Sequence, residues 1–386
     1  MIKIKIKKDE FPNIVFYLLY VLFYFFTLVK FGMGNSISNL RYYFLAFFCL
    51  FSIIALLFKF RQGYINKVNY KRLLLVIPLG VILLACSFYR ASVVGQYISM
   101  RTFVQTSLVV LPAIYAFCLL NNCEKKTIIF LMKCTLIVTI IAYFLESNHS
   151  FIEFFKISNW SGMTFEDNFL ESSVCSGTFV QLYLFFKYYC MKDNKDKYNL
   201  KIWKNVSFIF SLICFKRLGM FFVVFIAITS NFINYNKKIN SKIFFILSIV
   251  ITILTYYYCQ FVKGNLDLFG INVYEFTTGR NYIMKLWEKS NYFSYGYGTS
   301  MLVIGRYLEM DLIQIYMELG LAITFIFIWV YINISEKKMY SLAIILFGLA
   351  GMLFASSLPS IFTWILMFIN ISFLQNDLNN DRNDNL

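Results

Sequence analysis

The stretch Ile243-Phe-Phe-Ile-Leu-Ser-Ile-Val-Ile-Thr-Ile-Leu-Thr-Tyr-Tyr-Tyr-Cys-Gln-Phe-Val262 contains no charged side chain. A helix over these residues is long enough to cross about 30 Å of hydrocarbon. Comparable apolar stretches recur along the 386 residues, of which 59% are hydrophobic and 15% charged, against roughly 25% charged in soluble domains. The sequence therefore predicts an all-α, polytopic transmembrane helix bundle and excludes an ordinary soluble domain.

We predict about twelve spans, because each apolar stretch is close to the length that a bilayer requires. Their expected bounds are 11–30, 40–58, 73–88, 102–120, 127–145, 174–191, 202–215, 217–233, 243–262, 310–333, 339–355 and 358–375. The seventh and eighth spans are crowded together, as are the last two. Each pair is either a hairpin of short spans or one broken helix. The first stretch is too long for a signal-peptide core, so it is expected to remain in the mature protein.

The distribution of basic residues predicts the orientation, since Lys and Arg gather in loops that face the cytoplasm. With the N-terminus inside, every inside loop is basic, through Lys3, Lys5, Lys7, Lys8, Lys59, Arg61, Lys67, Lys71, Arg72, Lys125, Lys126, Lys192, Lys195, Lys197, Lys201, Lys237, Lys238, Lys242, Lys337 and Lys338. The long outside segment 146–172 is instead acidic, and the second, 263–308, is rich in Gly, Tyr and Asn and is expected to carry a short helix. Both termini, including the polar tail 376–386, are therefore expected in the cytoplasm.

This topological explanation of the net charge of +16 makes a nucleic-acid partner unnecessary. The nine cysteines are scattered, mostly within apolar stretches, and form no CxxC pair, so we interpret them as small apolar residues. His149 is the only histidine. No metal site and no cofactor are expected.

Some basic residues fall outside against the orientation signal, namely Arg90, Arg101, Lys216, Arg217, Arg280 and Arg306. Lys216 and Arg217 are the clearest case, because they lie between two apolar stretches, where a charge is costly unless it pairs, snorkels or meets a ligand. Snorkelling at a helix end is one interpretation. The other is phosphate binding at the outer membrane face, for which the planar donor fork of Arg is suited.

Arg280 opens a predicted short helix with Ile283, Leu286 and Trp287 on one side. A basic residue in the first turn is unfavourable for the helix but, with the exposed N–H groups, suits an anion. A solvated loop arginine is the alternative. The following Tyr295-Gly-Tyr-Gly-Thr-Ser300 forms a tight aromatic loop, on which a sugar ring could stack; simple turn chemistry explains it equally well.

The tenth predicted span begins with polar residues on one helical face: Asp311, Gln314 and Glu318, at i, i+3 and i+7. Polar groups on one face of a membrane helix are expected to point into the protein or toward a wet cavity. Glu171, at the end of the acidic outside segment, is a further candidate acid or base.

At these residues the chain resembles the superfamily of O-antigen polymerases (Wzy) and O-antigen ligases, over roughly 171–320 and in the span count. The shared features are, in chain order, the basic pair Lys216 and Arg217, then Gly279, Arg280 and Trp287 in the large loop, the Gly-x-Gly turn at Gly296 and Gly298, and the helix ending Glu318-Leu-Gly320. The ligase pattern opens this last helix with His-Asn, where this chain has Glu309 and Met310. The resemblance therefore favours a polymerase, and a histidine base cannot be carried over.

The resemblance implies transfer of a glycan from undecaprenyl pyrophosphate to the sugar hydroxyl of another lipid-linked repeat unit, at the periplasmic face of a bacterial inner membrane. The expected base is Glu309 or Asp311, with Glu171 as a further candidate. The expected pyrophosphate ligands are Arg280, Arg217, Lys216 and Arg90, and Tyr295, Tyr297, Gln314 and Glu318 are expected to line the substrate site. A Wzz-like chain-length regulator is a candidate partner. An O-antigen ligase, a lipid-linked oligosaccharide flippase and a solute transporter remain as alternatives.

Overall fold

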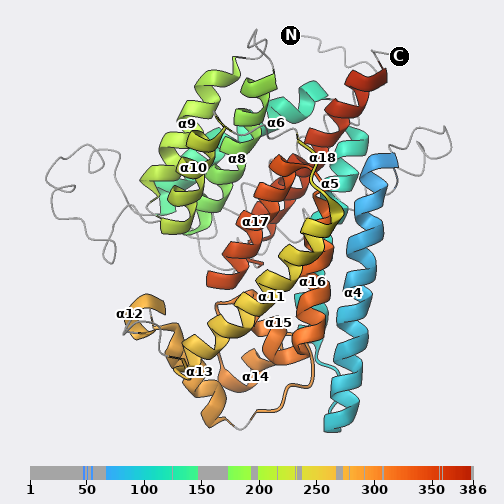
Figure 1. Ribbon diagram of the computed structural model, residues 1–386, viewed down its shortest axis with the longest axis vertical. Helices are drawn as coiled ribbons and strands as arrows, with labels where there is room; N and C mark the ends of the chain where they lie inside the picture. The colour runs from blue at the N-terminus through green and yellow to red at the C-terminus, as the bar shows by residue number, and fades with distance from the viewer. Residues whose placement is uncertain are drawn as a thin grey trace, which may run out of the picture. The chain divides into compact units, whose positions relative to one another are not determined.

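The computed structural model describes residues 47, 50, 54, 67–123, 125–146, 173–192, 199–214, 216–230, 232, 237–266, 273–277, 279–290, 292–306, 308–355, 357, 358 and 360–383. Its regular structure in these ranges is α-helical, apart from an isolated bridge between Lys238 and Lys338 (Figure 1). The prediction of an all-α protein is confirmed for this part of the chain. The predicted span 11–30, nearly all of 40–58, and residues 147–172 with Glu171 lie outside the described residues.

Four of the described helices are long and apolar enough to cross a membrane. They are α4 (Lys67–Val94), α5 (Met100–Asn122), α6 (Lys125–Glu146) and α11 (Ser241–Lys263). The shorter apolar helices are α10 (Arg217–Thr229), α16 (Leu321–Ile334), α17 (Met339–Phe354) and the first part of α18 (Ile361–Asn383). These helices coincide with predicted spans and agree with a membrane protein.

The predicted continuous helix over 310–333 is wrong. It is two helices, α15 (Asp311–Leu319) and α16, which Gly320 separates with φ 93° and ψ 171°. This backbone conformation favours glycine, which has no Cβ. The crowded pairs of predicted spans are likewise separate helices: α9 (Leu200–Ile213) precedes α10, and α17 precedes α18.

The chain divides into two compact units, and each is described by itself. Unit 1 comprises 1–70, 115–233 and 365–386, and its described helices include α6, α8 (Ser173–Lys192), α9 and α10. Aromatic rings fill its core: Phe179 stacks on Phe210 with centroids 5.2 Å apart. Helix α10 comes close to α8 at Gly219, where a Cβ would lie 2.9 Å from the Ser176 Oγ.

Unit 2 comprises 71–114 and 234–364. At one of its ends Arg72, near the start of α4, pairs with Glu336 after α16, with Nη2 and Oε1 3.4 Å apart. The Ile239 N–H donates to the Lys337 carbonyl at 2.7 Å, beside the Lys238–Lys338 bridge. The structure thus brings together loops that the charge pattern placed on one side of the membrane.

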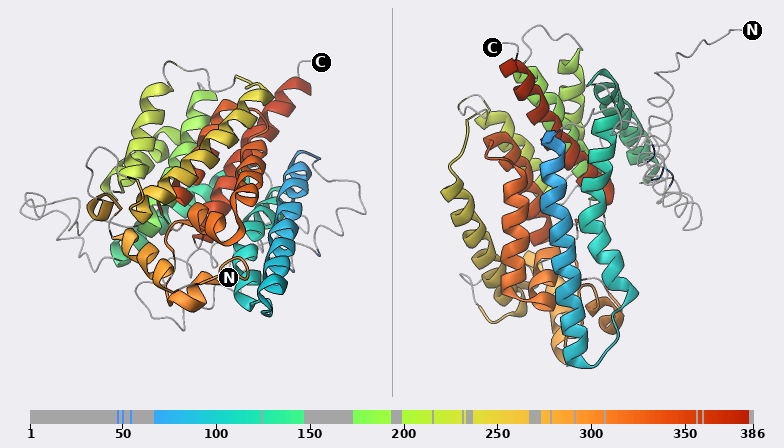
Figure 2. Two further views of the ribbon diagram at one scale, coloured as in Figure 1. Left: turned by 60° about the horizontal axis from the view of Figure 1, so that its bottom comes forward. Right: turned by 90° about the vertical axis from the view of Figure 1, so that its right-hand side faces the viewer.

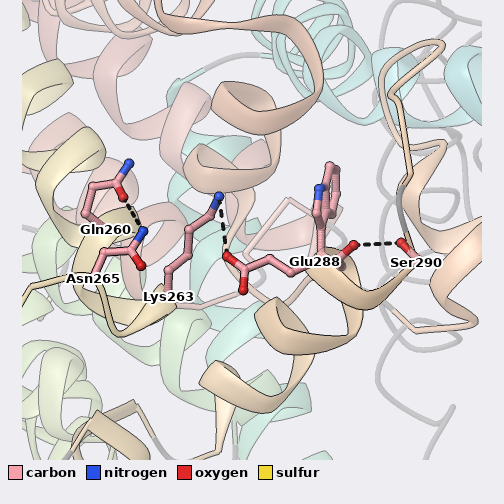
Figure 3. A network of polar contacts seen from close by, with 6 residues as sticks. Gln260, Lys263, Asn265, Glu288 and Ser290 are labelled. Carbon is pink, nitrogen blue, oxygen red and sulfur yellow. Dashed lines mark hydrogen bonds and ion pairs between the residues drawn. The ribbon is translucent and has the colours of Figure 1, made fainter.

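The opposite end of unit 2 is reached along α11, whose 23 residues span about 34 Å. We call it the outer end, because the predicted topology places its loops outside. Here α12 (Val273–Thr277), α13 (Arg280–Lys289) and α14 (Ser300–Ile304) gather beside α15 (Figure 1). An ion pair joins α11 to α13, with Lys263 Nζ 3.9 Å from Glu288 Oε1 (Figure 3). Buried Met284 and Trp287 seat α13 on the same apolar core as Cys259 and Ile313. The predicted short helix is confirmed, and of its predicted face Ile283 and Trp287 are buried, whereas Leu286 is only partly buried and Met284 is buried instead.

Helices α4 and α5 run side by side in unit 2 (Figure 2). Gly80 permits this approach, since a Cβ there would lie 2.5 Å from Val110 Cγ2. The outer ends of this pair, around Ser87 and Thr102, support the loop that forms the candidate site.

Candidate functional site

The loop Tyr295–Ser300 at the outer end is held by a buried carboxylate. Glu318 of α15 is 0% exposed, and its Oε2 accepts the Gly298 N–H at 2.6 Å. Its Oε1 accepts the Ser300 N–H at 2.9 Å and is 3.4 Å from the donating Nε2 of Gln314. A buried N–H group left without an acceptor is costly, and Glu318 supplies the acceptor for two of them. Glu318 therefore fixes the course of the loop backbone.

Helices α4 and α5 hold the same loop from another side. The Tyr297 N–H donates to Ser87 Oγ at 3.0 Å. Gly298 has a φ of +82°, and a Cβ on it would lie 2.4 Å from Gln105 Cγ. Both the backbone conformation and the close approach therefore require glycine at this position.

The two tyrosines of the loop lie differently, which corrects the prediction that both line a substrate site. Tyr297 is 0% exposed, so its ring is unavailable for stacking on a sugar, and burial raises its pKa well above the usual value. Tyr295 is partly exposed and contacts Tyr292 edge to face at 6.1 Å. Tyr292 contacts Trp287 at 5.0 Å, and burial raises its pKa as well. Of the two loop tyrosines, therefore, Tyr295 is the one that is partly exposed.

The polar face of α15 points inward, as predicted, with Asp311, Gln314 and Glu318 each at most 5% exposed. The Asp311 Oδ2 accepts the N–H groups of Ser357 and Leu358 at 2.7 and 2.8 Å, which ties α15 to the turn between α17 and α18. These contacts differ from the predicted roles of Asp311 as a base and of Gln314 and Glu318 as substrate-lining groups. In each case internal donors or acceptors engage the polar atoms.

Arg280 and Glu309 lie together at the surface of the outer end. Arg280 Nε is 3.6 Å from Glu309 Oε2, and its Nη1 donates to the Thr277 carbonyl at 3.1 Å. Their side chains are 23% and 54% exposed. Arg280 is the first residue of α13, as predicted, after Gly279 with φ +81° and no side-chain cap. The pair brings a predicted pyrophosphate ligand and a predicted base into contact.

Glu309 reaches Arg280 from an uncommon backbone conformation, with a φ of +21°. A non-glycine residue at positive φ costs free energy that the surrounding contacts must offset. The pair also counters the unfavourable position of a cation at the positive end of the α13 dipole.

Other predicted cations lie on the same end of unit 2. Arg101 Nη2 is 2.7 Å from Met301 Sδ, which links α5 to α14. Arg90 is exposed, and its Nη2 lies 3.6 Å from the position that a Cβ on Gly320 would occupy. Arg90 therefore flanks the break between α15 and α16. Arg306 is exposed just after α14.

Lys216 and Arg217 belong to unit 1, where they begin α10. Lys216 is partly buried at the N-cap, and Arg217 is exposed. Because these two residues and Arg280 belong to different units, a pocket that they share stays a prediction. Glu171 lies outside the described residues, so its role also stays a prediction.

Sequence reasoning missed Ser87 of α4 and Gln105 of α5, which contact the loop Tyr295–Ser300. Their signal was weak but present: each is a polar side chain near the end of an otherwise apolar stretch. Comparison with models of protein families, with curated proteins and with solved structures finds no match to this chain.

Gly298→Ala should destabilise the outer end by about 1–2 kcal/mol, because an alanine Cβ is strained in the left-handed backbone conformation of this position. Overpacking against Gln105 should add about 1–3 kcal/mol. Gly305→Ala is the matched control, because Gly305 has a φ of +74° and, among the described residues, nothing lies within 4 Å of the position that its Cβ would take. Thermal unfolding in detergent should show a larger drop in apparent melting temperature for Gly298→Ala. Equal drops would mean that the contact with Gln105 is unimportant.

Proposed function

We propose that this chain is a polysaccharide polymerase of the O-antigen type. It transfers a glycan from undecaprenyl pyrophosphate to the sugar hydroxyl of another lipid-linked repeat unit. In this proposal about twelve spans place both termini in the cytoplasm, and the outer end of unit 2 faces the periplasm. The supporting observation is the surface pair of Arg280 with Glu309, at the same end of the apolar helices as the loop that presents Tyr295.

The proposed chemistry needs charge stabilisation on the departing lipid pyrophosphate. A guanidinium supplies it through paired donors that match phosphate oxygens. Arg280 takes this role, and Arg90 of the same unit is proposed as a further ligand of the pyrophosphate. No metal ion is required in this scheme, because the leaving group is already activated.

The acceptor hydroxyl needs a base, which contributes roughly 10²–10⁴-fold. Glu309 suits this role better than Asp311, because it is the exposed carboxylate and does not cap a backbone turn. Tyr295 is proposed to stack on a sugar of one of the two glycans.

A deletion strain of the source bacterium tests the proposal. Lipopolysaccharide from the wild type should give a ladder on a gel, and the deletion should leave single repeat units attached to the lipid A core. Long carrier-linked polymer that accumulates unattached would instead indicate a ligase. A flippase is separated by an assay with isolated membranes, since it extends no chain. A full ladder in the deletion strain would contradict the proposal.

A further inference from the structure

Arg280, the proposed ligand of the pyrophosphate, forms an ion pair with Glu309, the proposed base. Arg280 Nε and Glu309 Oε2 are 3.6 Å apart, and both side chains reach solvent. The Arg280 Nε is buried, its distance from the carboxylate is too long for a hydrogen bond, and the Glu309 side chain is exposed, so the pair is held loosely. Ion pairs that solvent reaches contribute little to stability, typically below about 1 kcal/mol. A pyrophosphate carries more negative charge than one carboxylate and offers more acceptor oxygens, so it is the stronger partner for a guanidinium.

We propose that Glu309 occupies the phosphate position on Arg280 until the lipid pyrophosphate donor arrives and replaces it. This inference rests on the proposed function and adds an order of events to it. The donor binds Arg280, the Glu309 carboxylate is released, and only then is a base present beside the acceptor. While no donor is bound, the Glu309 carboxylate stays paired with Arg280 and does not act as a base.

The positive φ of Glu309 supports an exchange over a fixed structural pair. At φ +21° the Glu309 backbone is strained, and the contacts around it, including the pair with Arg280, must offset that cost, which leaves the pair less stable against a competing anion. Arg280 itself stays in place after the exchange, because its Nη1 also donates to the Thr277 carbonyl at 3.1 Å and Gly279 fixes the start of α13.

The transfer step then balances as follows. The acceptor O–H proton moves to the Glu309 carboxylate, and the oxygen forms a bond to the anomeric carbon of the donor glycan. The bond between this carbon and the pyrophosphate oxygen breaks, and its electron pair leaves with the lipid pyrophosphate, whose charge Arg280 stabilises. When the lipid pyrophosphate departs, Glu309 loses its proton to solvent and returns to Arg280.

The chain offers a matched control in Glu288. This carboxylate is 48% exposed, close to the 54% of Glu309, and it pairs with Lys263 at 3.9 Å rather than with Arg280 (Figure 3). Glu288→Gln removes the same charge from the same end of unit 2 without exposing Arg280.

The test measures the affinity of the purified, full-length protein for farnesyl pyrophosphate by calorimetry in detergent, and chain lengthening on lipid-linked repeats. Glu309→Gln should lower the Kd about fivefold, which corresponds to the loss of one exposed ion pair, and slow chain lengthening at least about a hundredfold. Glu288→Gln should change each by less than about twofold. Tighter binding combined with slower transfer is the expected result.

An unchanged Kd in Glu309→Gln while Arg280→Ala loses binding would overturn the exchange alone. Tighter binding with normal chain lengthening would instead reject Glu309 as the base, and with it the order of events. Binding by Arg280→Ala equal to that of the wild type would instead reject Arg280 as the phosphate ligand, and with it the proposed site. Glu309→Ala repeats the measurement without an amide that could form a new hydrogen bond.

Discussion

Arg280→Ala should reduce chain lengthening by about 10²–10³-fold while expression and membrane insertion remain normal. The reason is that one preorganised cationic donor at a developing charge is typically worth this much in rate. Arg280→Lys should retain part of the activity, because it keeps the charge but loses the planar donor fork. The measurement is the ladder of chain lengths on a gel, at protein levels matched by immunoblot.

Lys289→Ala is the control for Arg280→Ala. Lys289 is an exposed cation in the last turn of the same helix, and it has no proposed ligand. Its loss should leave chain length and amount within about twofold of the wild type, since exposed charges contribute little. A wild-type ladder from Arg280→Ala would contradict the proposed role of Arg280.

Glu318→Ala should disorder the loop Tyr295–Ser300 and abolish activity together with it. The substitution leaves the Gly298 and Ser300 N–H groups without their acceptor in a buried site. Each buried, unsatisfied donor costs about 1–3 kcal/mol, so the loop loses about 2–6 kcal/mol. Hydrogen exchange should therefore accelerate in peptides that cover 292–304, and less in α16.

Two further variants test this prediction: Glu318→Asp should have an intermediate effect, and Glu288→Ala is the control. Asp keeps the charge but is shorter by one methylene, so it should retain one of the two N–H contacts and part of the protection. Glu288 is exposed and bonds no loop N–H in the part of the chain that the structure describes, so its loss should leave exchange in the loop unchanged. Unchanged exchange in Glu318→Ala would show that the carboxylate does not hold the loop.

The helices were predictable because apolar length is a strong signal: α11 coincides with its predicted span to within two residues at its start and one at its end. The predicted span 310–333 runs through the break at Gly320, since the residues on both sides of it are apolar and the sequence continues as one hydrophobic stretch. Only the resemblance placed a helix end at Glu318-Leu-Gly320. A single glycine does not predict a helix break, because a helix tolerates an isolated glycine at a cost of about 1 kcal/mol in stability relative to alanine.

The candidate site was predicted in its charges but not in its contacts. Arg280 was selected because the charge pattern predicts that its loop lies outside, and its position at the start of a short helix is confirmed. The partnership of Arg280 with Glu309 depends on how the loop after α14 folds back onto α13, a tertiary contact without a local signal. The same holds for Asp311 and Glu318, whose spacing predicted a shared face but whose partners lie 46 and 20 residues away.

The most direct test of the central claim uses a photoreactive polyprenyl pyrophosphate and maps its attachment sites on the purified protein by mass spectrometry. If the cations at the outer end bind a lipid pyrophosphate, the probe should label residues within 273–309. This labelling should be suppressed by excess unlabelled farnesyl pyrophosphate and lost in Arg280→Ala. Labelling that avoids this segment, or that persists unchanged in Arg280→Ala under competition, would contradict the claim.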